Sequence, residues 1–138
     1  MNKFIGAIIQ NPKYGFLLQQ RTKDAPTYPL RWSLFGGAVE AKETPKQAIL
    51  RELQEEINLG PDKIKQIKVV QRNIQKNGNL QIIFYLETSA SLKDLTLKEG
   101  KQMKFATKEK LFRRKFAFNI KEVLEKFLNL PSLDPQSP

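Results

Sequence analysis

Residues 37–59 read GAVEAKETPKQAILRELQEEINL and contain the clearest secondary-structure signal in the chain. The start of the helical part carries an N-cap, a proline at the first helical position and the third-position partner of a capping box, namely Thr44, Pro45 and Gln47. Apolar residues then recur at helical spacing: Ile49, Leu50, Leu53 and Ile57. Asn58 tolerates the left-handed conformation that a helix C-cap often requires. The stretch therefore predicts a helix over 43–58 with one buried stripe.

Three glutamates of this helix, Glu52, Glu55 and Glu56, are spaced i, i+3 and i+4, so their side chains project from one side. They lie in the last two turns, where the helix dipole disfavours negative charge. A solvated acidic face is the ordinary explanation for such a cluster. The alternative is a divalent-metal site, because converging carboxylates repel one another until a cation neutralises them. From the helix alone, both interpretations stay open.

The amino-acid composition limits the kinds of catalytic and metal-binding site that this chain can form. The chain has 138 residues, enough for one domain, and 24 Lys and Arg against 14 Asp and Glu give it a formal net charge of +10. This balance favours anionic partners such as nucleotides, RNA or an acidic membrane surface. Because Cys and His are absent, disulfides, Cys/His zinc sites, thiol nucleophiles and Ser-His-Asp triads are excluded. A bound metal would need oxygen ligands, which indicates Mg²⁺ or Mn²⁺.

Outside this helix the pattern predicts a mixed sheet. Strand-like runs occupy residues 4–9, 14–20, 32–39, 64–72, 80–87 and 103–106. The pair Gly36-Gly37 indicates a bulge or a close backbone approach, and Asn77-Gly78 indicates a hairpin turn. One or two helical turns are expected over 107–114, and an amphipathic helix over 119–128. This order of elements predicts an α/β domain with helices packed on a mixed sheet.

Glycine and charged residues of the opening stretch recur at fixed spacing: Gly37, five residues, Glu43, seven residues, Arg51-Glu52-Leu53, one residue, then Glu55-Glu56. This arrangement resembles the signature of the Nudix hydrolases, G-x5-E-x7-R-E-U-x-E-E-x-G-U, where U is a bulky aliphatic residue. Asn58 departs from the signature's last glycine, and Leu59 fills the final aliphatic position. The resemblance implies a Nudix-type α/β/α sandwich, with the mixed β-sheet between helices, over residues 1–130. The Pro- and Ser-rich residues 131–138 are expected to be a disordered tail.

The same resemblance assigns roles to the residues of the motif. It implies four ligands for Mg²⁺ or Mn²⁺, namely the carboxylates of Glu52, Glu55 and Glu56 and the carbonyl oxygen of Gly37. Arg51 and Glu43 would orient these carboxylates, with large effects on metal affinity and catalysis. Members of the family hydrolyse a nucleoside diphosphate linked to another group, by attack of water on phosphorus.

The resemblance leaves two positions for the general base. It is either a glutamate of the helix, Glu55 or Glu56, or a glutamate in a late loop, and the absence of His leaves a carboxylate to take the proton. Glu99 lies where the family's loop glutamate is expected. The alternative is that Glu99 is only a loop carboxylate flanked by lysines.

Four residues outside the motif are candidates for substrate binding. Arg21 would point toward the phosphates in the family's geometry, or is a surface arginine. Trp32, like Tyr28, lies near the loop that would wall the pocket; either would stack on a base, and a buried tryptophan more often anchors a core. Asn119 would read a purine edge, as in relatives that clean the nucleotide pool, or would cap the terminal helix, which is favoured.

Together these features favour a metal-dependent pyrophosphohydrolase that acts on a small-molecule nucleotide, a (d)NTP or a nucleotide-sugar. An RNA 5′-end pyrophosphohydrolase is an alternative, because basic residues crowd the segment 110–115. A non-catalytic nucleotide sensor is a third reading, disfavoured because the motif keeps all its glutamates. No signal peptide or membrane span is indicated, so we expect a cytoplasmic monomer or homodimer without a membrane partner.

Overall fold

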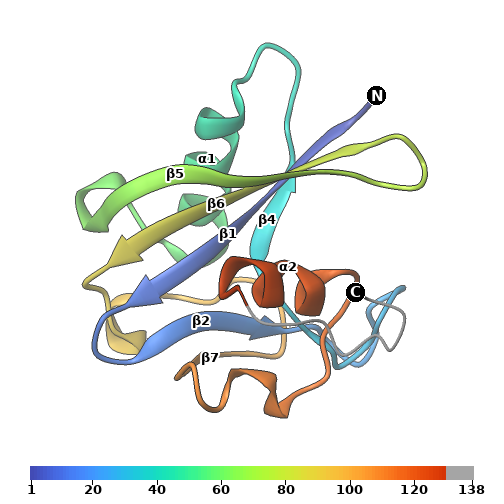
Figure 1. The fold of residues 1–138 in the computed structure, drawn as a ribbon. Helices are drawn as coiled ribbons and strands as arrows, with labels where there is room; N and C mark the ends of the chain where they lie inside the picture. Colours follow the sequence, from blue (N-terminus) through green and yellow to red (C-terminus); the bar gives the residue numbers. More distant parts are fainter. Residues whose placement is uncertain (130–138) are drawn as a thin grey trace.

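The computed structural model describes residues 1–129, and the tail predicted over 131–138 lies outside this part of the chain. Its elements, drawn in Figure 1, are β1 (Lys3–Asn11), β2 (Gly15–Gln20), β3 (Trp32–Ser33), β4 (Phe35–Ala38), α1 (Pro45–Ile57), β5 (Ile64–Ile74), β6 (Leu80–Thr88), β7 (Gln102–Ala106) and α2 (Ile120–Phe127). Three short 3₁₀ helices span Pro61–Lys63, Leu92–Asp94 and Leu111–Arg113.

The strands of the described residues form one mixed sheet around β1. The order is β3-β2-β1-β6-β5, with β4 also paired to β1 and β7 to β2. β1 runs parallel to β6 over eight residue pairs, whereas its pairings with β2 and β4 are antiparallel. Along β1, the segment Phe4–Ala7 pairs with β4, and only Gln10 and Asn11 pair with β2. β2 and β4 therefore adjoin different parts of the same edge of β1.

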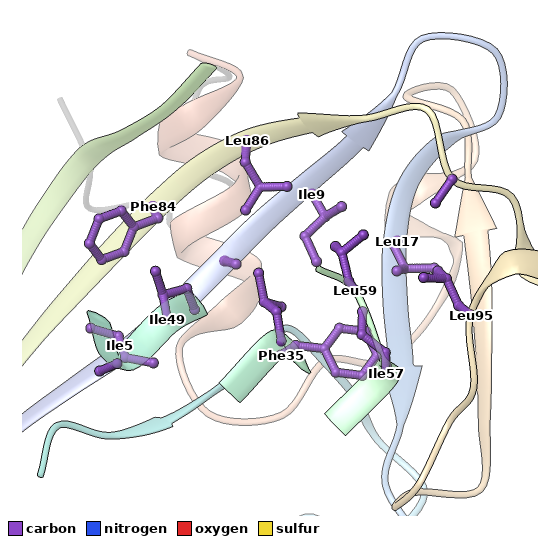
Figure 2. Close-up of a cluster of buried hydrophobic side chains, with 14 of the residues drawn as sticks. Ile5, Ile9, Leu17, Phe35, Ile49, Ile57, Leu59, Phe84, Leu86 and Leu95 are labelled. Atoms are coloured by element: carbon purple, nitrogen blue, oxygen red, sulfur yellow. The ribbon is translucent and has the colours of Figure 1, made fainter. Parts of the chain in front are cut away.

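The two α-helices cover opposite faces of this sheet, with α2 in front of it and α1 behind it in Figure 1. Alternation along the strands explains the two layers, because successive side chains of a strand point to opposite faces. In β6, Phe84 packs in the cluster on the α1 side, which Figure 2 shows, and its neighbour Tyr85 packs in the cluster on the α2 side. α1 contributes four fully buried apolar residues to the first cluster: Ala48, Ile49, Leu53 and Ile57. The predicted α/β/α sandwich is thus confirmed.

The helix boundaries of α1 follow the predicted caps. Thr44 accepts a hydrogen bond from the backbone N–H of Gln47, whose side chain in turn accepts from the N–H of Thr44, so the capping box is complete. Asn58 adopts the left-handed conformation at φ 56° and its N–H donates to the carbonyl of Gln54. The replacement of the signature's glycine by asparagine therefore preserves the helix end.

The single strand predicted over 32–39 is wrong. The chain instead forms two short strands, β3 and β4, that pair with β2 and β1 respectively. The change of partner occurs at Leu34, which is buried. The predicted close approach at Gly36 is confirmed, because a Cβ there would collide with the backbone of Ile5 and Gly6. Hydrophobic alternation marks a strand but carries no information on which neighbour it pairs with.

No helix among residues 1–129 has the length and apolar character needed to cross a membrane.

Candidate active site

A cavity of about 790 Å³ opens beside the edge of β1 where β2 and β4 diverge. Its wall includes parts of β1, β2, β4 and β6, the C-terminal half of α1, the loop before β7 and the start of α2. Glu56, Glu99 and Gly37 lie in one part of the wall, which we call the carboxylate end. Gln81 and Asn119 lie in another part, which we call the amide end. These two ends carry different chemistry.

The carboxylate end forms where α1 packs against β4. The backbone N–H of Gly36 donates to Oε2 of Glu56 over 3.2 Å. A Cβ at Gly37 would lie 2.5 Å from Oε1 of Glu52, so only glycine leaves this carboxylate its present place. The glycine of the motif is therefore required by a side chain fifteen positions later, on α1.

Burial and mutual repulsion change the acidity of these glutamates. Burial, followed by the nearby charge of Glu52, raises the pKa of Glu56 to about 8, with smaller contributions from Glu99 and Glu55. Burial also raises the pKa of Glu52, opposed by its hydrogen bond with Arg51. A partly buried carboxylate near other carboxylates is stabilised in its charged form by hydrogen bonds and by a nearby cation. Of the two interpretations left open, the solvated acidic face describes only Glu55, whose side chain is 60% exposed, whereas Glu52 and Glu56 are partly buried.

Arg51 is the cation nearest to the cluster. Its Nε and Nη2 donate to both oxygens of Glu43 over 2.7 and 3.0 Å, and the hydrogen bond to Glu43 is the main cause that raises the pKa of Arg51. The same bond lowers the pKa of Glu43 to about 2. Nη1 of Arg51 reaches Glu52 over 3.1 Å and Glu55 over 3.2 Å. Arg51 thus ties the start of the motif to two of the predicted metal ligands.

The loop before β7 places Glu99 beside Glu56. The backbone N–H groups of Thr96 and Lys98 donate to the carbonyls of Ile57 and Glu56, which are free at the C-terminus of α1. On its other side the loop is held by the N–H of Lys101, which donates to the carbonyl of Gln20 in β2. The proximity of Glu99 to the motif therefore follows from backbone hydrogen bonds at both ends of the loop.

The donor set at the carboxylate end fits a hard divalent cation. It consists of carboxylate and carbonyl oxygens only, and Glu56 is half-buried near the like charges of Glu52 and Glu99. Among residues 1–129, no three acidic side chains already stand at metal-binding distances. Glu52 and Glu55 are instead drawn to Arg51, so ligation requires that they exchange this partner for the ion.

Arg21 lines the cavity but does not point freely into it. Its Nε donates to the carbonyl of Thr27 over 2.9 Å, and its guanidinium lies 5.1 Å from the ring centre of Phe118. Tyr28 packs on the same phenylalanine at 4.8 Å between ring centres. Phe118 is half exposed and forms part of the cavity wall. An aromatic surface for a base is therefore present, but it is Phe118, which the sequence analysis had not selected.

Asn119 departs from the interpretation that the sequence favoured, whereas Trp32 agrees with the more common role of a core tryptophan. Asn119 occupies the N-cap position of α2, yet its side chain makes no capping hydrogen bond and instead pairs with Gln81, so the cap interpretation is wrong. Trp32 lies outside the cavity wall and packs against the core on the α2 side, under the guanidinium of Arg114 at 4.8 Å. Gln81 was missed altogether, although it is the polar residue inside the apolar run of β6.

The arrangement defines a class of protein: a mixed sheet between two helices, with a carboxylate-bearing helix beside a nucleotide-sized cavity. The chain belongs to the NUDIX domain family, whose model matches residues 3–127.

Individual relatives agree with this assignment. An 8-oxo-dGTP diphosphatase from Proteus vulgaris is 36% identical over 69 residues, and the match covers 50% of this chain and 60% of that protein. The DR0079 structure from Deinococcus radiodurans has a TM-score of 0.75 at 17% identity, covering 91% of this chain and 82% of its own. A MutT structure from work on Aliivibrio salmonicida and Vibrio cholerae has a TM-score of 0.71 at 21% identity, covering 93% and 97%. At these identities the two structures support the fold.

Proposed function

We propose that this protein is a metal-dependent pyrophosphohydrolase that cleaves a nucleoside triphosphate at a phosphoanhydride bond. The observation that carries the proposal is the carboxylate end itself, where Glu56 and Glu99 face one cavity and Glu52 lies against Gly37. The motif keeps every glutamate of the family signature, which favours an enzyme over a nucleotide sensor.

Different residues would bind the metal ion and accept the proton in this reaction. Glu52, Glu55, Glu56 and the carbonyl of Gly37 would hold Mg²⁺ or Mn²⁺, which when bound neutralises the polyphosphate and makes a water molecule more acidic. The water oxygen bonds to phosphorus as the anhydride P–O bond breaks, and the leaving phosphate takes that electron pair. Glu99 is our choice for the group that accepts the water's proton, because the loop hydrogen bonds hold it beside Glu56.

Arg51 would act on the ligands and not on the substrate. Nε and Nη2 of Arg51 donate two hydrogen bonds to Glu43. This leaves Nη1 to donate to Glu52 and Glu55. Because Arg51 stays charged at any working pH, it provides a resting partner for these carboxylates before the ion arrives. Arg21 lies in the wall that would face the phosphates.

The amide end supports a purine nucleotide as substrate. Asn119 offers a donor and an acceptor in the cavity wall, which suits the edge of a base. Phe118 offers a ring on which a base can stack. Similarity to a protein named 8-oxo-dGTP diphosphatase makes an oxidised guanine nucleotide the first substrate to test.

The test is a Mg²⁺-dependent hydrolysis screen over the four dNTPs, 8-oxo-dGTP, nucleotide-sugars, ADP-ribose and 5′-triphosphorylated RNA, with products identified by mass. Glu56→Gln is the test variant, and Glu122→Gln, on the exposed first turn of α2, is the matched control. We expect a nucleoside monophosphate and pyrophosphate, with turnover lost in Glu56→Gln and kept in Glu122→Gln. Nucleotide binding without turnover on any substrate would replace the enzyme with a sensor.

A further inference from the structure

The amide end continues away from the cavity as a chain of side-chain amides. Gln81 and Asn119 exchange two hydrogen bonds: Nε2 of Gln81 donates to Oδ1 of Asn119 over 2.9 Å, and Nδ2 of Asn119 donates to Oε1 of Gln81 over 2.8 Å. Asn73, opposite Gln81 in the β5–β6 pairing, donates from Nδ2 to the same Oε1 over 3.1 Å. Nδ2 of Asn73 also donates to Oε1 of Gln71 over 3.0 Å. Four amides therefore connect the cavity wall to the buried side of β5.

The side-chain amide of Gln71, at the end of this hydrogen-bonded series away from the cavity, has a fixed orientation. Gln71 is 6% exposed, and its Nε2 donates to the backbone carbonyl of Val123 in α2 over 2.9 Å. A carbonyl can only accept, so Gln71 must present its nitrogen to Val123 and its oxygen to Asn73. The ammonium of Lys126 can only donate, and it lies 3.5 Å from Oδ1 of Asn73. Both groups of α2 therefore require that Asn73 present its nitrogen to Gln81.

The orientation of the Asn73 amide determines that of Gln81, and Gln81 in turn determines that of Asn119 at the cavity wall. Because Asn73 presents an N–H, Gln81 must present Oε1 to it and Nε2 to Asn119. Nε2 of Gln75, at 3.5 Å, is a further donor near the same oxygen of Gln81. Rotation of either amide of the pair by 180° would bring oxygen against oxygen and nitrogen against nitrogen. The donor and acceptor of Asn119 thus keep one order at the cavity wall.

We propose that the chain Gln71–Asn73–Gln81 makes this site selective for one purine edge by fixing the hydrogen-bonding order of Asn119. The inference deepens the proposed function and rests on it for the identity of the ligand class. Adenine presents a donor at its exocyclic amine and an acceptor at N7, whereas guanine presents two acceptors there. Oxidation at C8 puts a proton on N7 of guanine, so the oxidised base presents the same two types of group as adenine in the opposite order. An amide of fixed order accepts one of these edges and rejects the other.

Gln81 and Asn73 have different roles in this proposal. Gln81 lines the cavity and would contact the base together with Asn119. Asn73 is not part of the cavity wall, so it is a positioning residue that acts through Gln81. A substitution at Asn73 can therefore change base selectivity without removing any contact to the ligand.

The experiment measures binding of GMP, 8-oxo-GMP and AMP by calorimetry, without metal, to the full chain. Asn73→Asp presents an acceptor to Gln81 and keeps a partner for Lys126, so the amides of Gln81 and Asn119 should both rotate by 180°. The variant also places an oxygen against Oε1 of Gln71, whose orientation is held by Val123. Asn73→Leu removes the nearer donor and leaves Oε1 of Gln81 only the longer contact, 3.5 Å, with Nε2 of Gln75. Arg72→Gln changes the exposed neighbour of Asn73 on β5 and is the control.

The wild type and Arg72→Gln should discriminate between 8-oxo-GMP and AMP by at least about tenfold. Asn73→Leu should bring this ratio close to one, and Asn73→Asp should reverse it. The side-chain NH₂ signals of Gln81 and Asn119 in ¹H–¹⁵N spectra should shift in both variants and stay in place in Arg72→Gln. If Asn73→Asp loses its fold, binding of all three nucleotides should weaken together. In that case Asn73→Leu provides the independent test.

An unchanged ratio in folded Asn73→Asp and Asn73→Leu, or a wild type that binds all three nucleotides alike, would overturn the proposal. Its failure is distinguishable from failure of the proposed function. Triphosphate hydrolysis with unchanged selectivity in both variants refutes the amide chain alone. Selective binding without hydrolysis of any triphosphate refutes the enzyme alone.

Discussion

The two ends of the cavity differ in how far apart in the sequence their residues lie. The carboxylate end comes almost entirely from residues 37–56, where one strand and one helix adjoin in sequence, and only Glu99 joins from a distant loop. The amide end combines β5, β6 and α2, so that Gln81 and Asn119 are 38 positions apart. If the proposed function holds, the groups for the reaction are encoded locally, and the groups for base selection depend on the packing of distant elements.

The largest effect is expected at Gly37. Gly37→Ala places a Cβ where Oε1 of Glu52 now lies, 2.5 Å away, so the carboxylate must move from its position beside the strand. We expect kcat/KM to fall on the order of a hundredfold for all substrates alike, as displaced metal ligands do. The unfolding midpoint in urea should change little, because the colliding atoms are the end of a flexible side chain.

Gly60→Ala is the matched control for Gly37→Ala. A Cβ at Gly60 also meets only side-chain oxygens, those of Asp62 and Gln54, and Gly60 does not line the cavity. Equal losses of activity in the two variants would contradict a special role for the glycine of the motif.

A smaller loss is expected for Arg51→Lys. Lysine keeps the charge but cannot bind both oxygens of Glu43 and reach Glu52 at the same time. Activity should fall by about ten- to fiftyfold, with the loss in apparent metal affinity visible in a Mg²⁺ titration of the rate. Arg72→Lys on exposed β5 serves as the control. An unchanged Mg²⁺ dependence in Arg51→Lys would show that this arginine does not organise the ligands.

At the other end of the cavity, Asn119→Ala should alter selectivity more than rate. The variant removes the amide that is proposed to face the base and leaves every carboxylate in place. We expect the kcat/KM ratio between the preferred and the disfavoured purine triphosphate to fall about five- to tenfold. A uniform loss on all substrates, or none, would contradict a base-reading role and return Asn119 to a structural one.

The smallest expected effect is on how the stability against urea depends on pH. The bond to Arg51 lowers the pKa of Glu43 from 4.5 to about 2. The unfolded state therefore binds this proton more readily, so Glu43 adds stability above pH 4.5 and loses that contribution as the pH falls toward 2. The difference in urea midpoint between wild type and Glu43→Gln should be largest near pH 6 and should shrink at pH 3. A difference that stays constant over this range, with Glu122→Gln as control, would contradict the assignment.

The sequence was most informative where structure is local. The capping box at Thr44 and the C-cap at Asn58 predicted α1 almost to the residue, and the motif predicted which side chains gather at the carboxylate end. The mixed α/β architecture also followed from hydrophobic periodicity, because each face of the sheet needs its own apolar partner. These features depend on neighbours within a turn or a strand.

Prediction failed where partners are distant. The parallel pairing of β1 with β6 joins residues about 77 positions apart, and no local pattern specifies it. Asn119 fits a helix cap by its position, and only the packing of β6 against α2 gives its amide a stronger partner in Gln81. Trp32, by contrast, packs against the core on the α2 side, which is the role that the sequence favoured over a pocket wall.

The most direct measurement compares both ends in one assay. Steady-state hydrolysis of 8-oxo-dGTP, dGTP and dATP is followed for wild type, Glu56→Gln and Asn119→Ala at saturating Mg²⁺. We predict that Glu56→Gln loses turnover on all three substrates in equal proportion, whereas Asn119→Ala retains turnover and changes only the ratios between them. Retained turnover in Glu56→Gln, or equal proportional losses in both variants, would contradict the division between a catalytic and a selective end.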